Sequence, residues 1–380
     1  MRKTFTLIAA LVMIATMAKA ETTGMVANEA STDQGYLESK DALFAAPAPA
    51  ADAEKDANYW AGAVGSRVKV MGYAQAGYTA TFNEGNSSAN TNTFDMKRAI
   101  LMVAVDITKD FYAFFMHDFK SGTMQEYYME YRPSKAMKFR FGQSKKELSM
   151  ENPMSPTVLE SIGPMSQGVM ALCGGKYDAT GTAGVYNGSG RDIGLTMYGD
   201  LFNDKLRYVV SVLNGNKINN VDDNNQKDIV AKLEYKFVPN FRVSLSGQKG
   251  YTGPKGSVIR SDRYAFGAEW KSKKEGTDYN LNRCTTVRAE ALGGRDGDVH
   301  SFATYISAAI PVAKRLDVVS MVDYFNRNTD AKLNQTNVMG GLQYWIHKKC
   351  RLQAQYEYNF RSEAAGKNSS NIRTQVQVSF

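Results

Sequence analysis

Residues that alternate between apolar and polar recur along most of this chain, and this pattern limits what it can fold into. In the last ten residues, NIRTQVQVSF, every second residue from Ile372 to Phe380 belongs to a largely apolar set. The residues between them are Arg373, Gln375, Gln377 and Ser379. Successive side chains of a β-strand point to opposite faces. The pattern therefore predicts a terminal strand with one apolar and one polar face.

The same alternation is found in segments such as RVKVMGYAQAGYTATF, KDIVAKLEYKF and RLQAQYEYNF. It predicts sixteen strands, near residues 67–82, 94–107, 111–120, 124–132, 137–146, 190–200, 204–214, 226–238, 240–251, 262–273, 283–294, 299–311, 315–328, 335–347, 350–360 and 370–380. An even number is typical of bacterial outer-membrane barrels.

The connections between these strands alternate in length. Every second one is a tight turn, such as Pro133–Lys135 or Asn203–Asp204, and those between are mostly longer and rich in Asn, Gly and Ser. This asymmetry fits a barrel whose two ends face different solvents. Two connections depart from it, since Lys271–Asn282 is long and Ser121–Thr123 is short, and they leave the strand number open by two.

A soluble β-sandwich is the alternative to a membrane barrel, because it also needs two-faced strands. The predicted strands commonly exceed ten residues, which suits tilted membrane strands with about 9–11 spanning residues. Tyr and Phe gather near strand ends, as in interfacial aromatic girdles. We therefore predict an all-β transmembrane antiparallel barrel of about 16 strands. Its last strand should pair with its first, because an open edge in lipid leaves backbone groups unsatisfied.

The N-terminus carries the features of a secretory signal peptide. Basic residues precede an apolar run from Thr4 to Thr16, and Ala18-Lys19-Ala20 resembles a cleavage site. A transmembrane helix is the alternative, but it needs about 20 apolar residues. We predict a signal peptide at 1–20, a flexible periplasmic segment or a short docking helix at 21–60, and the barrel at 61–380.

Charge and cysteine content exclude several classes of site. Cleavage after Ala20 removes three bases and lowers the net charge from +8 to +5. The mature chain keeps Cys173, Cys284 and Cys350, which are far apart and show no metal-binding spacing. We expect no metal, no cofactor and no nucleic-acid partner, and one disulfide is allowed but not required.

The connection from Glu147 to about Ser189, between the fifth and sixth strands, is much longer than the others. Loops of this length in compact domains are usually functional. Its sequence is apolar enough to pack against a wall. Its place after the fifth strand resembles that of the loop that folds into the lumen and narrows the pore in sixteen-stranded porins, so we predict the same course here. A disordered external loop is the alternative.

Basic residues are predicted to line the lumen near this loop. In KFRFGQSKK, Phe139 and Phe141 should face lipid, so Lys138 and Arg140 should face the lumen. The predicted pore-lining and constriction residues are Lys138, Arg140, Lys145, Lys146, Arg98, Arg242, Arg288 and Arg373. Such groups attract anions and repel cations. Acidic residues are interspersed on the same faces, so counting charges does not give the net selectivity.

The segment GQSKKELSMEN resembles the G-Q-F-K-x-P-F-S-x-E segment of the phosphate-selective porin O and P family. The matching residues are Gly142, Gln143, Lys145, Ser149 and Glu151. Ser144, Glu147 and Leu148 depart from the pattern. The stretches FDMKRAILMVAVDITKDFYAFFMHDF, EYYMEYRP and GRDIGLTMYGDL also look alike, and the resemblance runs over roughly 68–380.

The resemblance implies a sixteen-stranded trimeric porin of the outer membrane that passes small anions such as phosphate. It also implies an inward loop that carries basic residues, with Lys145 as a constriction candidate. The terminal Phe380 resembles the aromatic residue that outer-membrane proteins present to the barrel-assembly machinery. The expected partners are therefore small anions, outer-membrane lipid, copies of the same chain and that machinery.

Other functions remain open at this point. The barrel could be weakly selective, could pass oligosaccharides, or could serve as an adhesin. A barrel enzyme such as a phospholipase would need a nucleophile with its base. The chain has three His residues, His117, His300 and His347, none with a recognisable Ser partner. We therefore expect a channel and not an enzyme.

Overall fold

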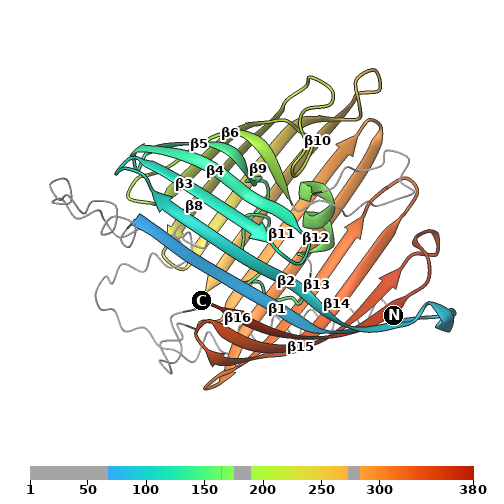
Figure 1. The fold of residues 1–380 in the computed structure, drawn as a ribbon. Coiled ribbons are helices and arrows are strands. Elements are labelled where there is room, and N and C mark those ends of the chain that lie inside the picture. Colours follow the sequence, from blue (N-terminus) through green and yellow to red (C-terminus); the bar gives the residue numbers. More distant parts are fainter. Residues whose placement is uncertain (1–66, 164, 175–189, 273–282) are drawn as a thin grey trace. The chain divides into compact units, whose positions relative to one another are not determined.

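A closed barrel of sixteen antiparallel strands makes up the described part of the chain (Figure 1). The computed structural model describes residues 67–163, 165–174, 190–272 and 283–380. The strands are β1 (Val68–Asn83), β2 (Thr91–Asp106), β3 (Phe111–Asp118), β4 (Thr123–Ser134), β5 (Met137–Lys145), β6 (Arg191–Leu201), β7 (Leu206–Leu213), β8 (Asp228–Val238), β9 (Phe241–Thr252), β10 (Ile259–Lys271), β11 (Thr286–Asp296), β12 (Val299–Ala313), β13 (Leu316–Asn326), β14 (Asn334–His347), β15 (Cys350–Arg361) and β16 (Ser369–Ser379).

The predicted strands are all present, in the predicted order, with ends that differ by three residues or fewer. The short connection near Ser121–Thr123 does join two strands, β3 and β4, so the count of sixteen is confirmed. The long connection between β10 and β11 contains residues 273–282, which lie outside the described residues. The predicted signal peptide and the segment 21–60 lie outside them as well.

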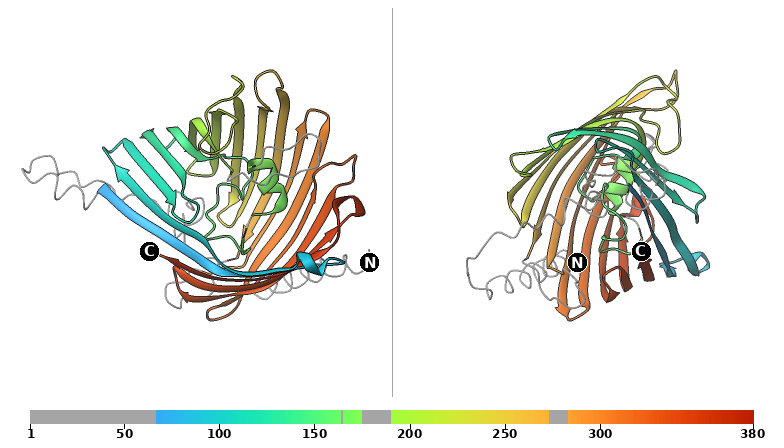
Figure 2. Two further views of the ribbon diagram at one scale, coloured as in Figure 1. Left: turned by 45° about the vertical axis from the view of Figure 1, so that its right-hand side comes forward. Right: turned by 60° about the vertical axis from the view of Figure 1, so that its left-hand side comes forward.

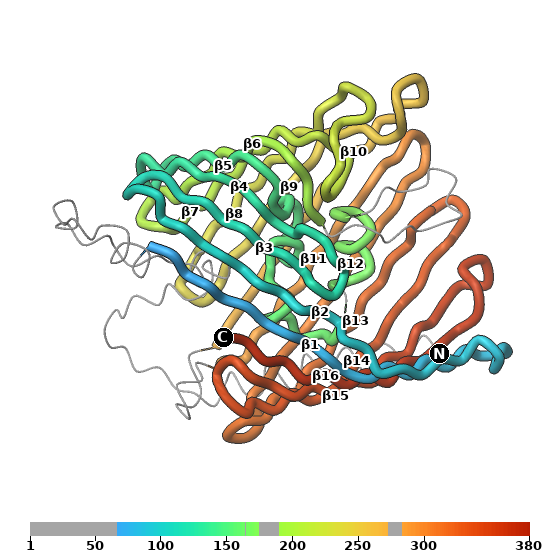
Figure 3. The backbone as a smooth tube through the Cα atoms, in the orientation of Figure 1, coloured from blue at the N-terminus to red at the C-terminus, as the bar shows by residue number. Residues whose placement is uncertain are grey.

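The first and last strands close the barrel. β1 and β16 pair antiparallel from Tyr73–Ser379 to Asn83–Ser369, and Figure 3 shows them side by side. The Phe380 N–H donates to the Gly72 carbonyl at 3.0 Å, and the Gly72 N–H donates back at 3.4 Å. Each described strand therefore has two hydrogen-bonded neighbours, which leaves no open edge.

Apolar side chains lie on the outside of the barrel and polar ones on the inside. Phe141 and Leu245 are each 60% exposed on the outer surface, whereas Gln375 and Gln377 are 3% and 2% exposed. A soluble sandwich would bury its apolar faces instead. That alternative is wrong, and the exterior suits a lipid environment.

Helices contribute little to the part of the chain that the structure describes. They are η2 (Ser87–Ala89), α4 (Gln167–Val169), η3 (Met170–Gly174) and η5 (Glu363–Ala365). No described helix has the length and apolar content to cross a membrane. The three cysteines, one of them buried, form no disulfide with one another.

The contact between Gly72 and Phe380 can be used to test how the first and last strands close the barrel. A Cβ on Gly72 would lie 2.5 Å from Cζ of Phe380 and 2.6 Å from the Ile100 carbonyl oxygen, so Gly72→Val should displace the terminal ring. We expect it to destabilise the barrel by about 1–3 kcal/mol, the usual cost of overpacking. The midpoint of heat-induced unfolding, followed by the gel mobility of the folded barrel, measures this.

Gly340 in β14 is the matched control, because no atom lies within 4 Å of its added Cβ. Gly340→Val should leave the midpoint nearly unchanged. Equal midpoints for the two variants would contradict the role given to the Gly72–Phe380 contact.

Candidate functional site

The connection between β5 and β6 is here called the inner loop (residues 146–190), and its described part runs inside the ring of strands. Figure 2 shows its described part, 146–163 and 165–174, with the short helix α4 in the barrel interior. The described part forms hydrogen bonds with inward residues of β1, β8, β9, β11, β13, β15 and β16. The predicted inward course of this loop is confirmed.

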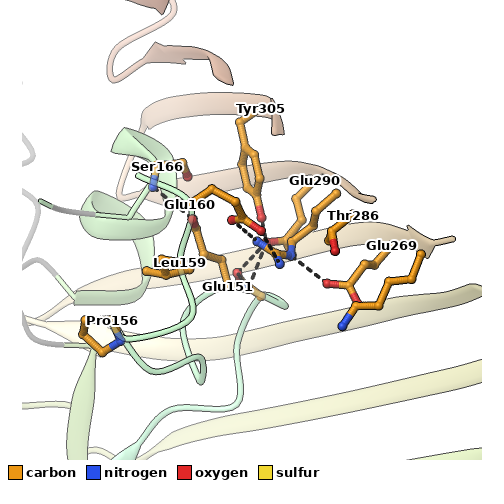
Figure 4. A network of polar contacts seen from close by, with 12 residues as sticks. Glu151, Pro156, Leu159, Glu160, Ser166, Glu269, Thr286, Glu290 and Tyr305 are labelled. Carbon is orange, nitrogen blue, oxygen red and sulfur yellow. Dashed lines mark hydrogen bonds and ion pairs between the residues drawn. The ribbon is translucent and has the colours of Figure 1, made fainter. Parts of the chain in front are cut away.

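Glu290 of β11 holds the first turn of the inner loop. Its carboxylate accepts hydrogen bonds from the Ser149 hydroxyl at 2.8 Å, the Met150 N–H at 2.6 Å and the Glu151 N–H at 3.2 Å. The Tyr305 hydroxyl of β12 donates to the same carboxylate at 2.9 Å (Figure 4). Because the acceptor is charged, each of these bonds is stronger than a neutral one.

Glu151 follows in the loop and is 2% exposed. Its carboxylate accepts from the Ser166 N–H at 2.9 Å and so joins two parts of the loop. Burial raises the pKa of Glu151 to about 8, although the nearby Arg288 and the Ser166 N–H act in the opposite direction. The group is therefore mostly protonated near neutral pH.

A chain of alternating carboxylates and basic groups, here called the charge ladder, begins and ends on the inner loop. Its members in order are Glu160, Arg288, Glu269, Arg242, Glu234, Lys232 and Glu147. Arg288 is fully buried and lies 3.1 Å from Glu160 and 3.0 Å from Glu269. The ladder has three bases and four acids, so these bases add no net positive charge.

Backbone carbonyls of the loop segment 154–160 accept hydrogen bonds from the opposite side of the barrel. Arg351 of β15 donates to the Leu159 carbonyl at 3.0 Å, and Gln355 donates to the Glu160 carbonyl at 2.6 Å. Lys145 donates to the Met154 carbonyl at 2.5 Å. The loop is thus held from both sides of the lumen.

The end of the described loop packs on β12 and β13. The Ser166 side chain caps α4 by accepting from the Val169 N–H, and the Gln167 N–H donates to Asp323 at 2.8 Å. A Cβ on Gly168 would lie 2.1 Å from Cβ of Ala303, so only glycine allows this approach.

Arg140 and Lys138 face the lumen, as their alternation with the outward Phe141 predicts, but both are paired. Arg140 lies 2.7 Å from Glu130. Its guanidinium also lies 4.4 Å from the centre of the Tyr128 ring. Lys138 lies 3.7 Å from Asp200. Neither side chain is open to a passing anion without loss of these contacts.

The remaining predicted residues lie at separate places. Lys146 approaches Gln248 at 3.4 Å, and Arg373 pairs with Glu357 at 3.0 Å. Arg98 donates to Gln75 at 2.9 Å, and it forms no ion pair with any described residue. The structure therefore joins Arg242 and Arg288 through Glu269, joins Arg140 and Lys138 around Tyr198, and leaves the others apart.

The acids and amides that hold the loop were missed as functional residues. Nothing in the local sequence of Glu290 predicts which loop atoms it binds, or that Glu234 pairs with Lys232 and Arg242. The described loop residues contain one base, Lys146, beside the acids Glu147, Glu151 and Glu160. No group of three or more His, Cys, Asp or Glu among the described residues is arranged to hold a metal ion.

The three His residues lie away from the inner loop. His117 packs between Phe115 and Phe119, with ring centres 6.3 Å and 4.9 Å away. His300 and His347 are exposed. The ring contacts of His117 and the exposure of His300 and His347 are typical of structural residues at a protein surface.

No family model matches this chain, and no curated protein matches it in sequence. Solved structures do match in fold. An anion-selective porin from Comamonas acidovorans has a TM-score of 0.60 at 12% identity, over 82% of this chain and 99% of its own. The outer membrane channel DcaP of Acinetobacter baumannii has a TM-score of 0.58 at 13% identity, over 82% and 97%. OprB of Pseudomonas putida has a TM-score of 0.56 at 9% identity, over 85% and 96%. At these identities the likeness establishes the barrel fold.

The contacts of Glu290 predict that its negative charge stabilises the first turn of the inner loop. Glu290→Gln replaces a charged acceptor by a neutral one and puts an N–H₂ group where donors converge. We expect the loop to lose about 2 kcal/mol of local stability, so that the Met150 and Glu151 amides exchange about 30-fold faster. Hydrogen exchange measures this, with Glu363→Gln on an exposed outer loop as the control. Unchanged exchange at both amides would contradict the assignment.

The pKa of Glu151 predicts a pH dependence of the loop. Because the folded-state pKa of about 8 lies above the usual value of 4.5, the folded loop keeps a proton that an open loop releases. The loop should be most stable below about pH 4.5 and lose stability as the pH rises towards 8. Hydrogen exchange of the loop, corrected for intrinsic rates, should show this trend, and Glu151→Gln should remove most of it. A trend of the same size in the variant would assign it to other groups.

Proposed function

We propose that this chain is an outer-membrane porin that allows passive diffusion of small hydrophilic solutes. The observation that carries the proposal is a polar lumen, inside a barrel with an apolar exterior, crossed by a loop that is bonded to both sides. A loop held in this way narrows a channel without the need for a lid. The porins and channels among the matching solved structures support the same function.

The proposal includes location and assembly. The apolar outer surface would face lipid, and the predicted signal peptide would direct the chain to the outer membrane. A trimeric form is described for one matching structure, OmpT of Vibrio cholerae, and supports a homotrimer here. The terminal Phe380, 61% exposed on the outer surface, would be presented to the barrel-assembly machinery during insertion.

A weak preference for anions is the selectivity that the lumen supports best. The loop acids Glu147, Glu151 and Glu160 are 7%, 2% and 7% exposed, so they are turned away from solutes. The less buried side chains of the loop, such as Ser155 and Thr157, are neutral. Arg98, whose charge no described acid pairs, then contributes an unbalanced positive field near the loop.

A dedicated phosphate site is less well supported. Phosphate is bound by basic groups that are free to donate several hydrogen bonds. Arg140, Arg242 and Arg288 already donate to carboxylates. A phosphate would have to displace these acids and leave them buried without partners, which is costly. We infer a diffusion channel, not an enzyme and not a phosphate-specific pore.

Reversal potentials in planar bilayers under a KCl gradient test this function. We expect chloride to permeate better than potassium. Arg98→Glu should lower the chloride-to-potassium ratio by about fivefold, as expected for two unit charges in a water-filled lumen. Lys367→Glu, on an exposed outer loop, should change the ratio by less than about twofold because its field is screened. Added phosphate should not block the current.

Three results would contradict the proposal in different ways. A barrel that inserts without conductance would contradict the channel function. Equal effects of Arg98→Glu and Lys367→Glu would contradict the lumen origin of the selectivity. Block by phosphate at low concentration would restore the phosphate-selective interpretation of the sequence.

A further inference from the structure

A cavity of about 390 Å³ lies between the inner loop and the inner face of β13 to β16 and β1. Its wall differs from the charge ladder because neutral amides dominate it. They include Gln335, Asn337, Gln355, Asn359 and Asn371. The outer loops 327–333 and 362–368 follow the strand ends at this side, so the cavity lies towards the end of the barrel that carries the longer loops.

One carboxylate in this cavity has no counter-charge. Asp323 of β13 is 4% exposed, and its Oδ2 accepts the Gln167 N–H at 2.8 Å. Its Oδ1 is buried and accepts no hydrogen bond, and the side chain forms no ion pair with a described residue. Glu357, in the same cavity, is satisfied by Arg373 and Asn371, each at 3.0 Å. Asp323 is therefore the acid in this cavity with an unsatisfied acceptor position.

The surroundings of Asp323 restrict what would fill that position. Asn337 lies directly opposite on β14, and Asn359, also 4% exposed, has an Oδ1 without a donor. The open atoms are thus acceptors and need a ligand that donates. Met321 and Met339, opposite each other on β13 and β14, add an apolar wall beside them. Calcium or magnesium would need about six or more oxygen ligands, and this set is too small for them.

We propose that Asp323 forms a subsite for the primary ammonium group of a small organic solute. The ammonium supplies three donors and the missing positive charge, and the attached alkyl chain packs on Met321 and Met339. The subsite rests on the proposed channel function, because the solute reaches the cavity by diffusion through the mouth of the barrel. It gives an otherwise weakly selective channel one position that holds amines.

Calorimetric titration of the full-length, detergent-solubilised protein with n-butylammonium chloride tests the subsite. Tetramethylammonium chloride is the matched probe, since it has the same charge but no N–H group. We expect n-butylammonium to bind about tenfold more tightly or better, the usual range for a hydrogen bond to a buried charge. This comparison uses the unaltered protein, so a folding defect of a variant cannot affect it.

Two variants assign the effect to one carboxylate. Asp323→Asn keeps an oxygen for the Gln167 N–H but removes the charge, and it should weaken n-butylammonium binding by about tenfold or more. Glu357→Gln removes an acid from the same cavity that already has partners, and it should change binding by less than about twofold. Equal binding of the two probes, or equal losses in the two variants, would overturn the subsite.

Conductance measured on the same preparations separates the two proposals. An open channel that binds both probes equally overturns the subsite and leaves the porin function intact. Tight n-butylammonium binding by a barrel without conductance supports the subsite and overturns the channel.

Discussion

The position of the inner loop depends on how buried charges are paired, and Arg288 is at the centre of this pairing. Its guanidinium is fully buried and joins Glu160 of the loop to Glu269 of the wall. A charge taken out of water is costly unless an opposite charge and hydrogen bonds replace the water. The loop supplies one of the two acids, so moving it away would leave Arg288 short of a partner. The ion pair with Glu160 that neutralises Arg288 of the wall therefore also holds the loop across the lumen.

The lumen has two different walls as a result. The side that carries the charge ladder, on β8 to β11, is dense in ion pairs that begin and end on the loop. The other side, on β14 to β16 and β1, holds the loop backbone with neutral amides such as Gln75, Gln355 and Gln377. Charged groups pair with one another on the first side, and the second side also holds charged groups, such as Arg351 and the Arg373–Glu357 pair. A lumen of this kind has many charges but a weak net field, which favours diffusion over strict selection.

The fold was predictable because a membrane barrel imposes a local rule. Each strand must present one face to lipid and one to water, so alternation in segments such as 370–380 gives the strands, with ends that differ by three residues or fewer. The contacts of the site follow no such rule. Glu160 and Arg288 are 128 residues apart, and Glu290 and Ser149 are 141 apart. The sequence predicts Arg242 and Arg288 on the lumen face, but it does not say which acids neutralise them, and that decides their function.

The segment that resembles the phosphate-selective porin family shows why a motif can predict the course of a loop better than it predicts which solute a channel carries. Its matching residues Lys145, Ser149 and Glu151 are buried. Lys145 holds the Met154 carbonyl, Ser149 donates to Glu290, and Glu151 accepts from the Ser166 N–H. Gln143, fully buried, bonds the Met124 carbonyl and Asn219. Lys145, Ser149 and Glu151 are thus engaged in attaching or shaping the inner loop, whereas Gln143 binds β4 and the connection between β7 and β8. A chain that shares this segment should therefore share the inward loop, whereas the solute preferences proposed for this chain rest on other residues, Arg98 and Asp323.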